Sequence, residues 1–458
     1  MPARYADFIR SKRITDRPSG FEPGTVNPNL FDWQAQVVQW ACRRGRFGGY
    51  EDCGLGKSIQ ELESARMVSE HTGRPCIIFA PLAVAAQTKR EAAKFDIQAD
   101  VTICRSGEDV RPGINIANYE RLHLFDPAEF GGVILDEGSI LKSLDGKTRG
   151  ALLDEWAQVP YRQSWSATPS PNDYMELGNQ AQFLGVMSRA EMLSTFFVHD
   201  GGETSKWRLK GHCRDLFWEW MASWCVMIRS PSDIGFSDDG YVLPEIKYTD
   251  HILPSKAQEG QLFATGATSL NDRRAAKRIS MTERCDQAAA ITAESDGPCV
   301  VWCGLNAEGE RLAKVIPGSV EVAGRHSTEK KEEMLAAFTI GEIQTLITKP
   351  KIGGFGLNWQ HCASTIVFPT DSFEQWYQMV RRFWRFGQER VVHVHTVATE
   401  EELPVVMNLR RKEREVMEMF DGIAAAMGEL TKKVIGSVER EDDSYSPETQ
   451  MEIPQWLR

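Results

Sequence analysis

Short apolar runs alternate with longer amphipathic stretches through the first part of the chain. The runs at 76–80, 101–104, 114–117 and 133–135 have the length and composition of buried strands, and we expect a further strand at 161–165. Residues 30–42, 57–70 and 83–95 instead carry apolar side chains at helical spacing. Strands that alternate with helices predict a parallel, doubly wound sheet with its functional loops at the carboxyl ends of the strands.

This pattern breaks between about residues 171 and 250 and then resumes. Apolar runs at 298–302, 345–348, 365–368 and 391–395 predict the strands of a second α/β domain. Within the break, Trp218, Trp220 and Trp224 lie in segment 216–227 at helical spacing, where packing into a core is a commoner role than stacking on bases.

The predicted organisation is therefore two α/β domains with additional segments. We expect an extended arm over 1–27, a first domain with a helical insertion over 28–235 and a second domain over 236–400. A helical extension with an acidic tail follows over 401–458. The tail ends on Trp456-Leu-Arg, which either packs back on the body or binds a partner protein.

Composition places the chain among ordinary globular proteins. Its 458 residues are too many for one core, and 42% of them are hydrophobic and 26% charged. No run of 18 apolar residues occurs, so we expect no membrane span, and the first residues lack the apolar region of a secretion signal. The expected location is the cytoplasm.

The cysteine and histidine residues do not form a pattern that predicts a metal site. The ten cysteines form no C-x-x-C pair, so packing as small hydrophobic residues in a reducing compartment is the better interpretation. His393 and His395 share a strand face, but no cysteine or acidic cluster completes a ligand set.

The segment Glu-Asp-Cys-Gly-Leu-Gly-Lys-Ser at 51–58 is the first chemical signal. A glycine-rich turn before a helix leaves backbone N–H groups free to surround phosphate oxygens, and Lys57 adds a positive charge. The hydroxyl of Ser58 suits Mg²⁺. The full phosphate-loop pattern requires glycine five residues before Gly56, where this chain has Glu51, so the turn alone also fits an ordinary helix cap.

The second signal is Val-Ile-Leu-Asp-Glu at 133–137. Asp136 follows a short apolar strand, where a carboxylate can hold the metal, and Glu137 is placed to polarise a water molecule. An acidic strand end downstream of a Gly-Lys-Ser turn predicts a nucleoside-triphosphate site.

The second domain adds positive charge. Arg382 and Arg385 lie three residues apart in the run 381–388, which we predict to be one helix that presents both guanidinium groups to the same surface. An arginine brought from another domain can stabilise transition-state charge on a γ-phosphate, whereas the alternative is a solvated charged face. Upstream, Lys349 and Lys351 precede a glycine-rich segment and suit contacts with phosphodiesters.

These segments and their order along the chain resemble those of superfamily-two helicases, specifically the Swi/Snf-like branch of double-stranded DNA translocases. Segment 51–58 is similar to that branch's phosphate turn, which also lacks the distant glycine, and 136–139 to its acidic motif. Segments 30–34, 166–172 and 382–388 resemble its glutamine element, coupling motif and arginine motif. The resemblance covers roughly residues 28–400, and the compact chain is similar to the minimal forms of bacteriophage and bacterial genomes.

The residues and the resemblance together give a set of expected roles. The catalytic residues are Lys57, Asp136, Glu137, Arg382 and Arg385. The ATP contacts are Gln34, Gly54, Leu55, Gly56, Lys57, Ser58 and Gly356. The DNA contacts are Pro81, Tyr119, Thr168, Lys349, Lys351 and Gly354, and the Mg²⁺ ligands are Ser58 and Asp136.

The resemblance implies two RecA-like domains with ATP and Mg²⁺ in the cleft between them, and ATP hydrolysis that drives stepping along duplex DNA. One departure is Ser139, which stands where the branch usually has histidine and cannot match the reach of an imidazole. A net charge of −11 argues against non-specific coating of DNA but allows a local basic groove. Two alternatives stay open: a strand-separating DNA or RNA helicase, and a nucleic-acid-binding protein switched by ATP.

Overall fold

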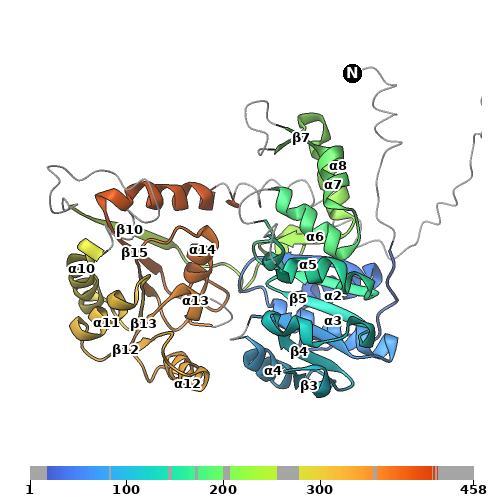
Figure 1. Cartoon of the computed structure of the whole chain (residues 1–458), viewed down its shortest axis with the longest axis horizontal. Coiled ribbons are helices and arrows are strands. Elements are labelled where there is room, and N and C mark those ends of the chain that lie inside the picture. The colour runs from blue at the N-terminus through green and yellow to red at the C-terminus, as the bar shows by residue number, and fades with distance from the viewer. Residues whose placement is uncertain are drawn as a thin grey trace, which may run out of the picture.

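The computed structural model describes residues 18–81, 84–142, 147–170, 174–199, 207–254, 278–353, 358–414, 416–417 and 420. They form two lobes, one coloured blue to green and the other yellow to red (Figure 1). Each lobe is built on its own sheet. The predicted tail with Trp456, most of the N-terminal arm, and Gly354 and Gly356 lie outside the described residues.

The sheet of the first lobe has seven strands in the order β3-β4-β2-β5-β6-β1-β9, and all of its pairings are parallel. The strands are β1 (Arg46–Glu51), β2 (Cys76–Ala80), β3 (Val101–Ile103), β4 (Ile114–Asn118), β5 (Gly132–Asp136), β6 (Tyr161–Trp165) and β9 (Cys225–Ile228). Because the strands are parallel, the carboxyl ends of β1 and β5 meet at one edge of the sheet.

Both faces of this sheet are covered, which explains the continuous apolar run of strands such as β2. Along β2, Ile78 packs with α2 (Asp32–Arg44) and α3 (Lys57–Thr72), whereas Ile77 and Phe79 face the opposite core. That opposite face is covered by helices that include α5 (Lys147–Asp154) and α6 (Leu177–Leu184). A further helix, α4 (Ala85–Lys94), contacts α3, β3 and β4.

The tryptophan-rich segment is a core element, as predicted, because Trp218, Trp220 and Trp224 are all buried. The segment 216–227 is helical only in its first part. Helix α8 (Arg214–Ala222) ends at a turn, and β9 then pairs with β1. The apolar residues of β9 pack well in a sheet, and this pairing prevails over the helical spacing of the tryptophans. Between β6 and β9 in sequence also lie α7 (Arg189–Phe196) and the antiparallel pair β7 (Phe197–His199) and β8 (Trp207–Leu209).

The second sheet is also parallel, in the order β10-β15-β14-β11-β13-β12. Its strands are β10 (Ile246–Leu253), β11 (Cys299–Trp302), β12 (Ser319–Val322), β13 (Thr345–Thr348), β14 (Ser364–Val367) and β15 (Val392–Thr399). Its helices are α10 (Met281–Glu294), α11 (Asn306–Val315), α12 (Thr328–Thr339), α13 (Pro350–Gly353) and α14 (Phe373–Arg381). Residues 403–414 are helical as well.

Strand β10 was not predicted. Its eight residues pair with the whole of β15, but it lies at the edge of the sheet, and residues 247–250 are exposed. An edge strand that buries so little has no apolar run for a sequence pattern to detect.

The predicted fold class is confirmed: the chain has two α/β domains with parallel sheets, each of the RecA-like kind. The exact boundaries at 27, 235 and 400 stay a prediction. Over the described part of the chain, every helix is too short or too polar to cross a membrane. All ten cysteines are unpaired, and nine of them are buried, in keeping with their predicted role in packing.

Candidate functional site: a cleft between the two domains

The phosphate turn joins the end of β1 to the start of α3. Gly54 and Gly56 have φ angles of +94° and +80°, which side chains rarely adopt, so the shape of the turn depends on glycine at both positions. No side chain caps the N-terminus of α3, which leaves its first backbone N–H groups without a partner from the helix. Together with the helix dipole, these groups make the turn suitable for an anion.

Hydrogen bonds from two side chains stabilise the turn. Lys57 donates from Nζ to the carbonyl oxygens of Glu51 at 2.8 Å and Asp52 at 3.2 Å. Gln34 donates from Nε2 to the carbonyl of Leu55 at 2.8 Å, and its Oε1 accepts from the backbone of Phe31 at 3.1 Å. Gln34 therefore supports the phosphate turn as well as lining the cavity beside it.

The acidic end of β5 lies in the same cavity. Tyr119 donates its hydroxyl to the carbonyl of Asp136 at 2.6 Å and so fixes the last residue of the strand. The next residue, Glu137, has a φ of +56°, a left-handed conformation that is uncommon for a residue with a side chain. Such strain persists where the surrounding structure imposes it, and this is common at functional sites.

Electrostatics favours a cation at this point. Burial raises the pKa of Asp136 to about 7, with a further contribution from the charge of Glu137, while Lys57 acts in the opposite direction. Burial also raises the pKa of Glu137, and Lys57 and Arg382 oppose that change. Glu61 is fully buried, its pKa is raised well above the ordinary value by burial and then by Asp136, and its Oε1 has no hydrogen-bond partner in the described part of the chain.

The donors present fit Mg²⁺. Ser58 and Asp136 offer a hydroxyl and a carboxylate, which are the oxygen ligands that this ion prefers. Among the described residues, no group of three or more His, Cys, Asp or Glu side chains could enclose a metal ion. This agrees with Mg²⁺, which is held by one or two protein ligands and completes its shell with phosphate oxygens and water.

The second domain contributes the arginines, but not from one continuous helix. The predicted helix over 381–388 was wrong, because α14 ends at Arg381 with Arg382 as its C-cap. A series of turns follows, in which Gln388 donates from Nε2 to the carbonyls of Gln360, Cys362 and Phe383. Gly387 has a φ of +87°, which a helix does not allow.

Arg382 and Arg385 nevertheless both line the cavity. Arg382 is buried and donates from Nη2 to Oε1 of Gln378 at 3.1 Å. Burial lowers its pKa to about 10, the charge of Arg385 lowers it further, and Glu137 and Asp136 act in the opposite direction. Burial also lowers the pKa of Arg385. Two guanidinium groups that repel each other, one buried and one half-buried, form a favourable site for an anion.

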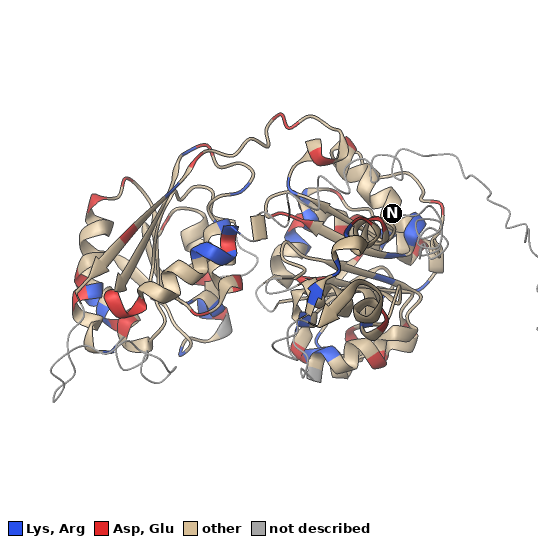
Figure 2. Cartoon of the chain, turned by 90° about the horizontal axis from the view of Figure 1, so that it is seen from above, with Lys and Arg blue, Asp and Glu red and all other residues tan. Residues whose placement is uncertain are grey.

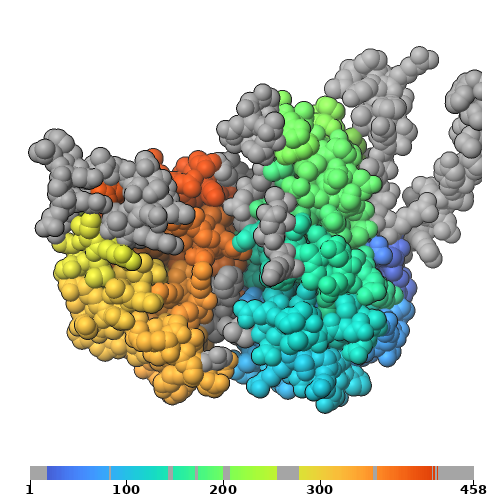
Figure 3. Space-filling view, viewed as in Figure 1, coloured from blue at the N-terminus to red at the C-terminus, as the bar shows by residue number. Residues whose placement is uncertain are grey.

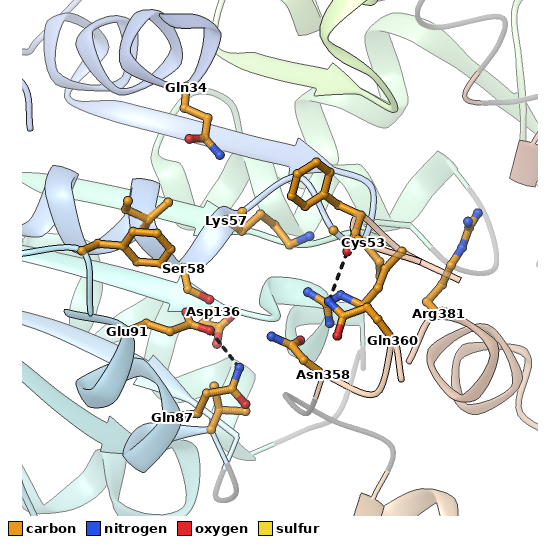
Figure 4. Close-up of a pocket in the computed structure, with 18 of the residues that line it drawn as sticks. Gln34, Cys53, Lys57, Ser58, Gln87, Glu91, Asp136, Asn358, Gln360 and Arg381 are labelled. Carbon is orange, nitrogen blue, oxygen red and sulfur yellow. Dashed lines mark hydrogen bonds between the residues drawn. The ribbon is translucent and has the colours of Figure 1, made fainter. Parts of the chain in front are cut away.

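These parts enclose one cavity of about 360 Å³. The first domain contributes Lys57, Ser58 and Asp136, and Asn358 and Gln360 come from the second (Figure 4). The two lobes lie side by side in the space-filling view (Figure 3). The sequence-predicted residues Gln34, Gly54, Gly56, Lys57, Ser58, Asp136, Glu137, Arg382 and Arg385 all line it.

One end of the cavity is aromatic. Phe31 precedes α2, Tyr241 lies between β9 and β10, and Phe386 follows α14. The rings of Tyr241 and Phe386 are 4.7 Å apart, and those of Phe31 and Tyr241 are 5.9 Å apart. Aromatic rings beside a phosphate turn suit a purine base, which can stack on them.

An ionic contact that the sequence did not predict joins the domains at the phosphate turn. Asp52 accepts from the hydroxyl of Tyr377 at 2.6 Å and pairs with Arg381 at 3.2 Å. Arg381 also lies over the rings of Tyr377 and Trp384. No single-sequence pattern links a turn residue to a partner more than 300 positions away, so only the fold reveals this contact.

The residues predicted to contact DNA do not gather at this cavity. Tyr119 and Thr168 are buried in the first domain. Lys349 donates to Oδ1 of Asn306 at 2.5 Å, Lys351 is exposed on α13, and Pro81 is half-buried after β2. The DNA contacts therefore stay a prediction.

Comparisons with known proteins add little. No protein-family model matches the sequence, and no curated protein matches it. Among solved structures, the chain is similar to the Sulfolobus solfataricus SWI2/SNF2 ATPase core in complex with dsDNA, at 16% sequence identity and a TM-score of 0.41. The match covers 91% of this chain and 98% of the other. Likeness at this level does not bear on what the chain binds.

Proposed function

We propose that this protein is an ATP hydrolase whose active site is the cleft between its two RecA-like domains. The observation that carries the proposal is a single cavity that contains a phosphate turn, two acidic residues at a strand end and two arginines from the other domain, one buried and one half-buried. Each part has a separate task in phosphoryl transfer, and no simpler binding site requires all of them.

The roles follow from the geometry. Lys57 and the N-terminus of α3 bind the phosphates, and Ser58 and Asp136 hold Mg²⁺. Bound there, Mg²⁺ would neutralise phosphate charge during the reaction. Glu137 orients and deprotonates the attacking water, and its raised pKa suits a base that works near neutral pH.

Arg382 and Arg385 stabilise the charge that develops on the transferred phosphoryl group. They can do so only while the second domain is docked, because both residues belong to it. Domain closure then controls the reaction, which is the behaviour required of a motor.

The finer proposal is that duplex DNA stimulates hydrolysis and that the enzyme moves along it. This part depends on the order of the sequence motifs and their resemblance to Swi/Snf-like translocases. In Figure 2, lysine and arginine are mixed with acidic residues on both lobes, so DNA contact would use a limited set of basic side chains. The expectation of a phage or bacterial type stays a prediction.

The test is steady-state ATP hydrolysis with duplex DNA, single-stranded DNA, single-stranded RNA or no nucleic acid. We expect duplex DNA to stimulate most, and we expect Lys57→Ala to lose activity by about a hundredfold or more, because it removes the positive charge facing the phosphates. The exposed Lys89→Ala is the matched control.

Each result selects among the open alternatives. Strongest stimulation by a single strand would favour the helicase. ATP-dependent DNA binding with little turnover would favour the switched binding protein. Full activity in Lys57→Ala would refute the assignment of the nucleotide site.

A further inference from the structure

A second ionic contact joins the domains, through another residue of α14. Glu374, near the start of α14, accepts from the hydroxyl of Ser139 at 2.9 Å through its Oε1. Its Oε2 forms an ion pair with Lys142. One carboxylate of the second domain thus contacts both ends of η4 (Gly138–Lys142), the short helix that directly follows Glu137.

The contact is sheltered from solvent. The side chain of Glu374 is 14% exposed, that of Lys142 is 30% exposed, and Ser139 is buried. Exposed ion pairs contribute little, but a sheltered carboxylate with both an ion pair and a hydrogen bond is more strongly held. Loss of Glu374 would leave Lys142 without this partner and Ser139 without its acceptor.

Glu374 also belongs to the polar face of α14 that faces the catalytic residues. Gln378 lies one turn further along, and Arg382 follows after another turn. Arg382 donates to Gln378, and both line the cavity beside Glu137. The start of α14 therefore contacts η4, and its end lines the cavity beside Glu137.

We propose that Glu374 is a positioning residue for hydrolysis, which fixes η4 when the second domain docks and so sets the place of Glu137 opposite Arg382. The strained backbone of Glu137 makes this necessary, because a residue at φ +56° requires support from its neighbours. Support comes from the domain that also provides the arginines, so the general base and the arginines reach their working positions together. The inference depends on the proposed function.

Substitution of Glu374 should separate positioning from binding. The Asp52 contact with Tyr377 and Arg381 is independent of Glu374, so the phosphate turn still receives the second domain. We therefore expect Glu374→Gln and Glu374→Ala to bind ATP as the wild type does. Their kcat should fall about tenfold to a hundredfold with KM unchanged, because a small displacement of a catalytic group has that effect.

Exchanging the charges of Lys142 and Glu374 tests whether a loss of kcat is caused by misfolding. Lys142→Glu and Glu374→Lys should each lose kcat, and the double variant should recover a substantial part of it, because Ser139 can accept from the new lysine. Ser139→Ala tests the hydrogen bond alone and should show a smaller loss. The exposed Glu389→Gln is the matched control.

The outcomes are distinguishable from failure of the proposed function. If the wild type hydrolyses no ATP under any condition, the proposed function fails first and this inference fails with it. If the wild type is active, wild-type kcat in Glu374→Gln overturns the inference alone. A parallel change of kcat and KM without recovery in the double variant also overturns it, because Glu374 would then be a general structural contact.

Discussion

Glu137 shows how much a single residue can reveal about a site. Its left-handed backbone, buried carboxylate and raised pKa coincide at the end of β5, facing an arginine from the other domain. The sequence predicted its role from the Asp-Glu pair alone, but not the strain or the contact of the neighbouring turn with Glu374. Those properties arise from tertiary packing, which a local pattern does not contain.

Substitution of Arg385 tests whether one residue can act in hydrolysis without contributing to ATP binding. Arg385→Ala should lower kcat by about a thousandfold while ATP affinity changes little, because the guanidinium stabilises charge that exists mainly in the transition state. Steady-state hydrolysis and equilibrium binding of a fluorescent ATP analogue measure the two quantities. The exposed Arg390→Ala is the control. An equal loss of binding and turnover would make Arg385 a ground-state ligand.

Glu51 predicts a pH dependence of stability. Burial raises its pKa to about 8, so between pH 4.5 and 8 the unfolded chain has lost a proton that the folded chain keeps. The free energy of unfolding should therefore fall as pH rises through this range, by at most about 1.4 kcal/mol per unit.

Glu51→Gln keeps the shape of the side chain and removes this titration. We expect it to stabilise the protein by a few kcal/mol at pH 8 and hardly at all at pH 4.5. Urea denaturation at both pH values measures the difference, with the exposed Glu120→Gln as control. An equal gain at both pH values would show that the charge of Glu51 is not responsible.

At the scale of elements, the sequence predicted several buried strands but overlooked others, including β1, β9 and β12. Strands 76–80, 161–165 and 345–348 were located to the residue, and they are buried along nearly their whole length. Edge strand β10 was overlooked because it buries little. The helix over 381–388 was misjudged, because the turn that replaces it is stabilised by Gln388 through carbonyls distant in sequence.

The second domain also contains an ionic contact that ties several elements together. Arg284 of α10 is fully buried and pairs with Glu308 of α11 at 2.7 Å, and Glu402 lies 3.8 Å away at the start of the C-terminal helical segment. Arg284→Ala would leave two buried carboxylates uncompensated. We expect it to destabilise the protein by about 3–5 kcal/mol.

The matched control is Arg311→Ala, whose partner Asp286 is largely exposed. That pair should contribute about 0–1 kcal/mol. Thermal and urea denaturation of both variants give the comparison. Similar small effects in the two variants would mean that water reaches Arg284, contrary to its burial.

At the scale of the whole molecule, net charge predicts how DNA binding should respond to salt. A chain with a net charge of −11 repels a polyanion at long range, so binding must depend on a small set of local lysines and arginines. Stimulation of hydrolysis by duplex DNA should fall steeply as salt rises, because those contacts release counterions from the DNA.

The rate without DNA should change much less over the same range, since it does not depend on contacts with DNA phosphates. Hydrolysis measured against DNA concentration at several salt concentrations separates the two effects. A DNA stimulation that is insensitive to salt would exclude phosphate contacts as the main source of binding.

The close approach of the domains at Gly54 bears on the speed of the enzyme. A Cβ atom at this position would lie 2.6 Å from the backbone nitrogen of Phe386, so the second domain rests directly on the phosphate turn. While it does, Phe386 covers the phosphate turn on this side. Spent nucleotide must then wait for the domains to part, and the rate of that separation sets an upper limit on the number of cycles per second, however fast the bond is cleaved.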